Sequence, residues 1–109
     1  MPVSITKHNF KQEIEEATKP VIVDAYAVWC GPCQHMTPIF EELEQELGSE
    51  YSFVKLNVDE SPDLAVHYKI LSVPTFLFIK NNEVVGREVG YINKEDLHTK
   101  IEQIFSKHK

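Results

Sequence analysis

Apolar runs along the chain predict a set of short strands. Such runs occur at residues 3–5, 21–27, 51–58, 75–80 and 83–89. The run at 21–27 (VIVDAYA) is almost continuously apolar and rich in branched residues, which is typical of a strand covered on both faces of a sheet. The last two strands are separated by Asn81-Asn82, and asparagine tolerates the positive φ angles of a two-residue hairpin. We therefore expect these two strands to pair with each other.

Apolar residues at helical spacing predict helices between the strands. The helices cover residues 9–18 and 32–47, a short stretch from a start signal at Ser61-Pro62 to Tyr68, and a last stretch after Asn93. Asn9 and Asn93 are the expected N-caps of the first and last helices, with Gln12 in the reciprocal position of the first. Pro38 should kink the second helix rather than end it, because the apolar period continues up to a stop at Gly48.

The order of these elements predicts an α/β fold. Helices alternate with strands, which indicates a central mixed sheet of four to five strands with helices on both faces. No internal repeat, low-complexity tract or linker interrupts the 109 residues. We therefore expect a single domain that spans residues 1–109.

The charge composition limits the classes of partner that the chain is expected to bind. The chain carries 17 acidic and 11 basic residues, a formal net charge of −6, which argues against strong attraction to nucleic acids or anionic membranes. The sequence shows neither a secretory signal nor an apolar run long enough to cross a bilayer, which favours a cytoplasmic location. No Lys or Arg occurs between Lys19 and Lys55, where five glutamates fall; this pattern is typical of a solvated helix face.

The two cysteines are Cys30 and Cys33. A cross-link between residues this close removes little entropy from the unfolded chain, so the pair is a poor structural staple. Both residues fall where a helix should begin, and positions i and i+3 of a helix share a face, within disulfide reach. Free N–H groups at the helix N-terminus would stabilise a Cys30 thiolate, the form that attacks disulfides. Gly31 allows a tight approach turn, and Pro32 suits the first helical turn.

Two other uses of a close cysteine pair fit the sequence less well. A structural zinc site needs about four ligands, but the chain has no second CxxC and no pair of histidines at the spacing of zinc ligands. Haem attachment would need a histidine directly after the second cysteine, whereas Gln34 follows Cys33. Metal binding and inert buried thiols remain the alternatives to redox exchange.

Five separated motifs together resemble the thioredoxin family over essentially the whole chain. They are Val23-Asp24, Trp29-Cys30-Gly31-Pro32-Cys33 with Pro38 beyond it, Lys55-Leu56-Asn57-Val58-Asp59, Ser72-Val73-Pro74-Thr75 and Val89-Gly90. The resemblance implies the thioredoxin fold, with Cys30 as the nucleophile and Cys33 as the resolving thiol. It also implies a protein-disulfide reductase that is recharged by an NADPH-dependent flavoprotein, a thioredoxin reductase. This chain has no Gly-rich dinucleotide motif, so we expect it to bind neither cofactor itself.

Asp24 interrupts the strand that should be the most buried. Burial raises the pKa of a carboxyl group toward the range that suits a general base. The resemblance places Asp24 beneath the dithiol, where it would shuttle a proton for Cys33, with Lys55 on the neighbouring strand moderating its charge. An Asp that faces solvent and an ordinary exposed strand lysine are the alternatives.

The resemblance also implies a substrate-binding surface. Its residues are Trp29, Gly31, Pro32, Val73, Pro74 and Gly90. Val73-Pro74 would carry a cis peptide and pair with an extended substrate backbone, although sequence alone favours trans. Gly90 would let the substrate approach closely, and Trp29 would form a flat apolar wall beside Cys30. The alternatives are a simple strand-end turn for Gly90 and a core aromatic for Trp29.

Four positions depart from the usual family pattern. They are Tyr26 for Trp or Phe, Val28 for an acidic or polar residue, Gln34 for Lys or Arg, and Asn82 for the hairpin glycine. Gln34 removes a cation near the dithiol, so the redox potential can differ from that of typical members. Val28 makes the rim of the site more apolar, which bears on the choice of partners.

The sequence thus predicts a monomeric electron carrier that acts on protein disulfides. Two other functions stay open at this point. A thiol oxidase or isomerase on the same fold would show a more oxidising potential. A non-catalytic binding module would use the Val73-Pro74 surface to hold a partner without exchange chemistry.

Overall fold

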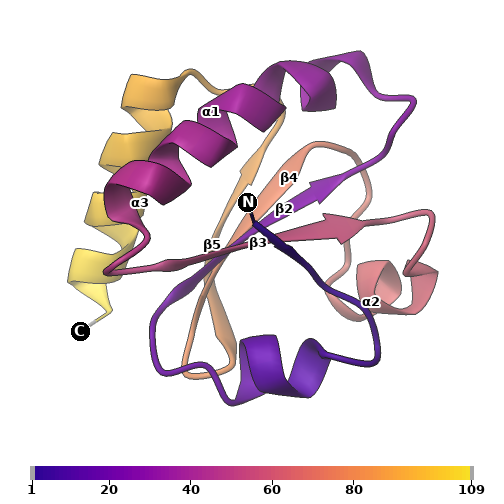
Figure 1. Cartoon of the computed structure of the whole chain (residues 1–109), viewed down its shortest axis with the longest axis horizontal. Helices are drawn as coiled ribbons and strands as arrows, with labels where there is room; N and C mark the ends of the chain where they lie inside the picture. Colours follow the sequence, from indigo (N-terminus) through magenta and orange to yellow (C-terminus); the bar gives the residue numbers. More distant parts are fainter. Residues whose placement is uncertain (1, 109) are drawn as a thin grey trace.

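A mixed sheet between two layers of helices forms the framework of the molecule (Figure 1). The computed structural model describes residues 2–108. In chain order its elements are β1 (Val3–Ser4), a π-helical turn η1 (Lys11–Glu15), β2 (Val21–Tyr26), α1 (Gly31–Leu47), β3 (Ser52–Asn57), α2 (Pro62–His67), β4 (Thr75–Lys80), β5 (Glu83–Val89) and α3 (Lys94–Lys107). The predicted fold class and the order of the predicted strands and helices are confirmed.

The five strands lie in the order β1-β3-β2-β4-β5. β1, β2 and β3 run parallel, whereas β4 is antiparallel to β2 and β5 is antiparallel to β4. β2 is therefore the central strand, and its side chains are buried on both faces of the sheet, which explains why its sequence is almost continuously apolar. Within β2, Asp24 lies between Lys55 of β3 and Phe76 of β4.

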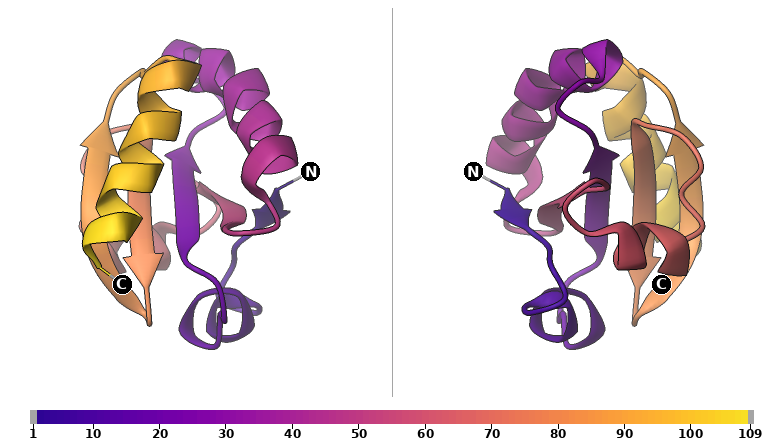
Figure 2. Two further views of the ribbon diagram at one scale, coloured as in Figure 1. Left: turned by 90° about the vertical axis from the view of Figure 1, so that its left-hand side faces the viewer. Right: turned by 90° about the vertical axis from the view of Figure 1, so that its right-hand side faces the viewer.

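The helices cover opposite faces of the sheet, with α1 and α3 on one face and η1 and α2 on the other (Figures 1 and 2). Side chains alternate along β2, so Ile22 packs in the core under α1 and α3, and Val23 packs in the core on the other face. Asp24, two residues after Ile22, consequently points to the face that α1 covers. α3 approaches β5 so closely that a Cβ atom at Gly86 would lie 2.8 Å from Cδ1 of Ile104.

The start of the chain differs from the prediction. Asn9 is not the N-cap of a helix: its side-chain oxygen accepts the Thr6 N–H at 2.8 Å, and its amide donates to the Ser4 carbonyl at 2.8 Å. Asn9 therefore closes the turn before η1, because a short amide side chain binds nearby backbone as readily as a helix end. Gln12 is exposed, and the predicted helix at 9–18 is shortened to the five residues of η1.

Other local signals are confirmed. Asn81 and Asn82 adopt φ angles of 52° and 63° in the β4–β5 hairpin, and the Asn93 side chain accepts the Asp96 N–H at 2.8 Å. α1 continues through Pro38 and ends before Gly48.

Within residues 2–108, no helix combines the length and the apolar character needed to cross a membrane.

Candidate active site

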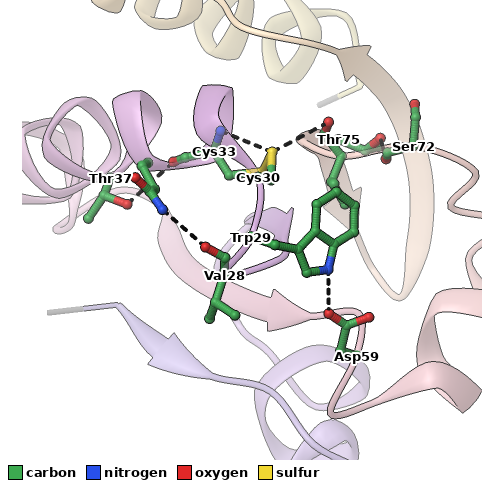
Figure 3. The surroundings of a disulfide bond; sticks show 10 residues. Val28, Trp29, Cys30, Cys33, Thr37, Asp59, Ser72 and Thr75 are labelled. Carbon is green, nitrogen blue, oxygen red and sulfur yellow. Dashed lines mark hydrogen bonds between the residues drawn. A yellow bond between two sulfur atoms is a disulfide. The ribbon is translucent and has the colours of Figure 1, made fainter.

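The two cysteines lie at the start of α1, after the loop that follows β2, and they are joined by a disulfide (Figure 3). Cys30 is the N-cap of α1, and its sulfur accepts the backbone N–H of Cys33 at 3.2 Å. The Cα atoms of the two residues are 5.3 Å apart. The sulfur of Cys30 thus occupies the place of a capping oxygen, where N–H groups and the helix dipole favour negative charge. The same position would stabilise a thiolate after reduction.

Trp29 stands beside the disulfide as an exposed side chain, 70% accessible to solvent. Its indole N–H donates to the Asp59 carboxylate at 2.8 Å, which ties the ring to the loop after β3 (Figure 3). The alternative of a core aromatic is therefore wrong. A large ring that is both exposed and held in place gives the site a flat apolar wall.

The loop between α2 and β4 lies on the other side of Cys30. Val73-Pro74 is a cis peptide, as the resemblance implies, and the Val73 carbonyl oxygen lies 3.8 Å from the sulfur of Cys30. The buried Thr75 donates its hydroxyl to the Ser72 carbonyl at 2.7 Å, which braces the turn. These contacts bring a stretch of backbone directly to the disulfide.

An apolar groove separates Trp29 from this loop. It has a volume of about 400 Å³ and is lined by Trp29, Val58, Ile70, Leu71, Ser72 and Val73. Leu71 is almost completely exposed, at 97%. Two of the lining residues adjoin Cys30, since Trp29 precedes it in the chain and the Val73 carbonyl lies 3.8 Å from its sulfur.

Gly90 follows β5 and borders the same loop. Its N–H donates to the Pro74 carbonyl at 2.8 Å. Its φ angle is +94°, which disfavours side chains, and a Cβ atom at this position would meet no atom of residues 2–108 within 4 Å apart from its own chain neighbours. Gly90 is thus required by its backbone conformation, and it leaves open space beside the cis proline.

Asp24 is buried on the sheet face beneath α1, with 1% of its surface exposed. Burial raises its pKa from 3.8 to about 7, and the Lys55 ammonium partly offsets the effect. Among the described residues, Oδ1 of Asp24 has no hydrogen-bond partner. The Lys55 ammonium lies 4.4 Å from the centre of the Tyr26 ring, a favourable cation–π distance. The alternative of an Asp that faces solvent is wrong.

The first turn of α1 supplies the remaining predicted residues. Gly31 and Pro32 are exposed and open the helix next to Cys30. The Gln34 amide donates to the Val28 carbonyl at 3.0 Å, so the residue that replaces the usual cation ties the loop before Cys30 to the helix. The structure therefore brings the predicted residues of β2, α1 and the two loops to one end of the sheet.

Several contributors were not singled out from the sequence. Asp59 and Thr75 occur within the quoted motifs, but their hydrogen bonds to Trp29 and Ser72 depend on how the loops meet in space. Leu71 is an ordinary apolar residue until its exposure is known. Within residues 2–108, no group of three or more His, Cys, Asp or Glu side chains is arranged to hold a metal ion.

Comparison with known proteins gives the relatives of the chain. The thioredoxin family model matches residues 1–103. The thioredoxin of Bacillus subtilis is 40% identical over 106 residues, which are 97% of this chain and 96% of that protein. The thioredoxin of Chlorobaculum thiosulfatiphilum is 42% identical over 98 residues, 90% of this chain and 91% of the relative. The chain belongs to the thioredoxin family.

Membership of the thioredoxin family establishes the class of activity. The chain is a thiol-disulfide oxidoreductase with a redox-active Cys30–Cys33 pair. A specialised oxidase or isomerase and a non-catalytic binding module are not favoured by these relatives. Thioredoxins act without a cofactor of their own, so the sulfur atoms carry the electrons themselves.

Proposed function

We propose that this chain reduces disulfides of other proteins, with Cys30 as the nucleophile and Cys33 as the resolving thiol. The observation that carries the proposal is the place of the Cys30 sulfur, which caps α1 and lies beside the backbone of Val73. The cap favours the thiolate, and the open groove next to it gives a substrate access. We further propose that residues 1–109 act as one monomeric domain in the cytoplasm.

The first step is attack on the substrate. In the reduced chain, the Cys30 thiolate attacks one sulfur of the substrate disulfide, and a mixed disulfide forms as the substrate S–S bond breaks. The other substrate sulfur leaves as a thiolate and takes a proton from solvent. An extended substrate segment would lie along Val73 and Gly90, because the Val73 carbonyl is close to the reacting sulfur and Gly90 has no side chain.

The second step is resolution by Cys33. Its thiol gives a proton to Asp24, and the resulting thiolate attacks the sulfur of Cys30. This bond closes the Cys30–Cys33 disulfide and releases the second substrate thiolate, which is then protonated. A carboxyl group with a pKa of about 7 can accept and return a proton near neutral pH. In total, two electrons pass to the substrate.

The oxidised chain must then be reduced again. We propose that a thioredoxin reductase, a flavoprotein that draws on NADPH, supplies the two electrons through a second round of thiol exchange. Neither cofactor would bind to this chain. The reductase and the substrates would meet the same end of the sheet, because the Cys30–Cys33 disulfide lies there.

Exposed apolar side chains on segments that border the candidate site suit contact with protein substrates. They are Val28, Trp29, Leu71, Val89 and Tyr91. Val28 and Trp29 directly precede Cys30, and Leu71 lines the groove. The β5 end, where Val89 lies, pairs with Thr75 of β4 beside the cis proline. An apolar rim of this kind favours substrates whose disulfides lie in partly unfolded or flexible apolar segments.

The experiment that tests this function traps the mixed disulfide. The reduced Cys33→Ser variant is incubated with oxidised insulin and analysed by mass spectrometry under non-reducing conditions. We expect a covalent adduct of one chain with one insulin chain, because attack proceeds and resolution cannot. The adduct should disappear on addition of dithiothreitol.

Cys30→Ser is the matched control. It keeps one thiol in the same helical turn but moves it from the cap to the interior of the turn, so we expect no adduct above background. Adducts of equal yield with both variants would contradict the assignment of Cys30. Failure of both variants to form adducts, while the unaltered chain also leaves insulin oxidised, would contradict the proposed function.

A further inference from the structure

The segment that carries Val73 to the disulfide is held from two sides. We define residues 69–74, between α2 and β4, as the substrate loop, since the proposed function places the substrate along it. At its end, the Pro74 carbonyl accepts the N–H of Gly90, just after β5. At its start, the carbonyl of Tyr68 accepts a hydrogen bond from the Arg87 guanidinium of β5. β5 and the residue that follows it therefore contact both ends of the loop.

The start of the loop has a strained backbone. Lys69 adopts a φ angle of 56°, a left-handed conformation that residues other than glycine rarely take. Such a conformation persists where the surrounding structure holds it in place. The N–H groups of Lys69 and Ile70 bond back to the carbonyls of Val66 and Ala65, so these bonds close the end of α2 upon itself.

The hydrogen bond from Arg87 differs from these backbone bonds because it connects the end of α2 to strand β5 of the sheet. A hydrogen bond from a guanidinium carries a full charge on the donor and is stronger than a neutral one. It also satisfies a carbonyl at the C-terminus of a helix, where positive charge is favoured. Its acceptor belongs to Tyr68, the residue immediately before strained Lys69.

We propose that Arg87 is a positioning residue for substrate recognition. Through the Tyr68 carbonyl it keeps the substrate loop against the sheet, so that Val73 and Leu71 present one surface next to Cys30. Arg87 acts through this loop rather than on the reacting sulfur atoms. The inference rests on the proposed function, because it gives the loop its importance.

Loss of the Arg87 contact should therefore affect protein disulfides and small disulfides differently. A protein disulfide must lie along the loop, so its binding depends on the loop being ordered. A small disulfide such as oxidised glutathione needs the Cys30 thiolate and little of the loop. Loss of the Arg87 contact should therefore weaken binding of a protein substrate and leave the chemistry of the dithiol intact.

The test uses the full chain, reduced beforehand and mixed in a stopped-flow instrument with excess oxidised insulin or oxidised glutathione. Oxidation is followed by the fluorescence of Trp29, the sole tryptophan. For Arg87→Met we expect the half-saturating insulin concentration to rise about three- to tenfold, within the range that loss of one charged hydrogen bond allows. The limiting rate with insulin and the rate with glutathione should stay within about twofold.

Two further variants guard the interpretation. Arg87→Lys retains a charged donor and should recover part of the lost affinity, and it also serves if Arg87→Met fails to fold. Glu88→Gln is the matched control: Glu88 is the next residue on β5, and its carboxylate pairs with Lys100 of α3, away from the substrate loop. We expect this variant to behave like the unaltered chain with both substrates.

Three results would overturn the inference. They are an unchanged half-saturation for Arg87→Met, an equal slowing of insulin and glutathione reactions, and a loss in Glu88→Gln that matches the loss in Arg87→Met. A failure of the proposed function is distinguishable, because the unaltered chain would then not reduce insulin at all.

Discussion

The N-termini of α1 and α3 are built alike and differ in what they can do. At α3 the side-chain oxygen of Asn93 accepts the N–H of Asp96, three residues on, at 2.8 Å. At α1 the sulfur of Cys30 accepts the N–H of Cys33, also three residues on, at 3.2 Å. Both are N-caps of helices longer than a dozen residues. One cap stabilises a helix, and the other carries the chemistry of the molecule.

The difference lies in the charges around the cap and in the atom that forms it. The first turn of α3 contains Glu95 and Asp96, which satisfy the positive end of the helix dipole. The first turn of α1 contains no acidic residue. Its N–H groups and dipole are thus left to act on the Cys30 sulfur. The N-terminus of α1, unlike that of α3, therefore has no competing negative charge in its first turn, which favours a thiolate at Cys30 after reduction.

The largest effect should come from exchanging the capping atom. We expect Cys30→Ser to abolish the reduction of insulin disulfides, because a hydroxyl caps a helix but does not attack a disulfide at neutral pH. The same exchange at the other cap, Asn93→Ser, should leave activity unchanged. Turnover with dithiothreitol as the reductant measures both. Activity retained in Cys30→Ser, with no loss of the fold, would remove the distinction between the two caps.

The second effect concerns Asp24, the buried acid on the strand that leads to the reactive cap. Its pKa of about 7 in the fold is above the ordinary 3.8, so the folded chain keeps a proton that the unfolded chain loses between these pH values. The free energy of unfolding should therefore fall as pH rises from about 4 to about 7, by roughly 4 kcal/mol. Asp24→Asn should abolish this fall and be the more stable protein at pH 8.

Urea denaturation at pH 4 and pH 8 measures the effect of Asp24→Asn on stability. The two proteins should nearly converge at pH 4, where the Asp24 carboxyl of the folded chain is protonated and is as neutral as the asparagine amide. Stopped-flow kinetics should show a slower resolution step and a nearly normal attack step, because Asp24 is proposed to serve Cys33. A parallel stability–pH curve in both proteins, or slowing of attack alone, would contradict the role assigned to the buried acid.

The third effect tests the purely structural cap. Asn93→Ala should lower the free energy of unfolding by about 1 kcal/mol, the usual loss for an N-cap oxygen. Activity toward insulin should not change, since Asn93 lies at the other helix. Thermal or urea denaturation and a turnover assay are sufficient. A loss of activity larger than the loss of stability would show that the two helix ends are not independent.

The smallest effect should come from making the reactive helix end resemble the other. Gln34→Glu places an acid in the first turn of α1, which would disfavour the Cys30 thiolate and slow attack at pH 7 about two- to fivefold. Gln34→Met is the control, because it also loses the hydrogen bond to the Val28 carbonyl but adds no charge. Iodoacetamide alkylation of Cys30 as a function of pH reports the effect. Equal rates in both variants would show that the charge is not decisive.

Much of the fold could be predicted because local signals and the overall pattern agree. The near-continuous apolar run at 21–27 predicted a central strand, and Asn81-Asn82 predicted the hairpin that the structure contains. Asn93 was a correct cap, whereas Asn9 was not. The two asparagines differ in their surroundings: Thr6 and Ser4 offered Asn9 nearby backbone partners, a competition that residue type alone does not resolve.

Some features of the candidate site could likewise be predicted from the sequence, and others could not. The spacing of Cys30 and Cys33 sufficed to predict a redox pair at a helix start, and burial of Asp24 followed from its strand. The cis state of Val73-Pro74 came from family resemblance, since the intrinsic preference of the peptide is trans. The contacts of Trp29 with Asp59 and of Arg87 with Tyr68 join residues distant in the chain. Such contacts depend on how loops meet, and no short-range pattern encodes them.

The disulfide has a further consequence because it closes within a single helical turn. Its two Cα atoms are 5.3 Å apart, and the bond connects no separate parts of the fold. Opening it therefore leaves the sheet and the surrounding loops free to stay as they are. The proposed reductase and a substrate would then meet almost the same surface, before and after electron transfer. The direction of electron transfer through such a carrier would then be set by the redox potentials of its partners rather than by a change in its shape.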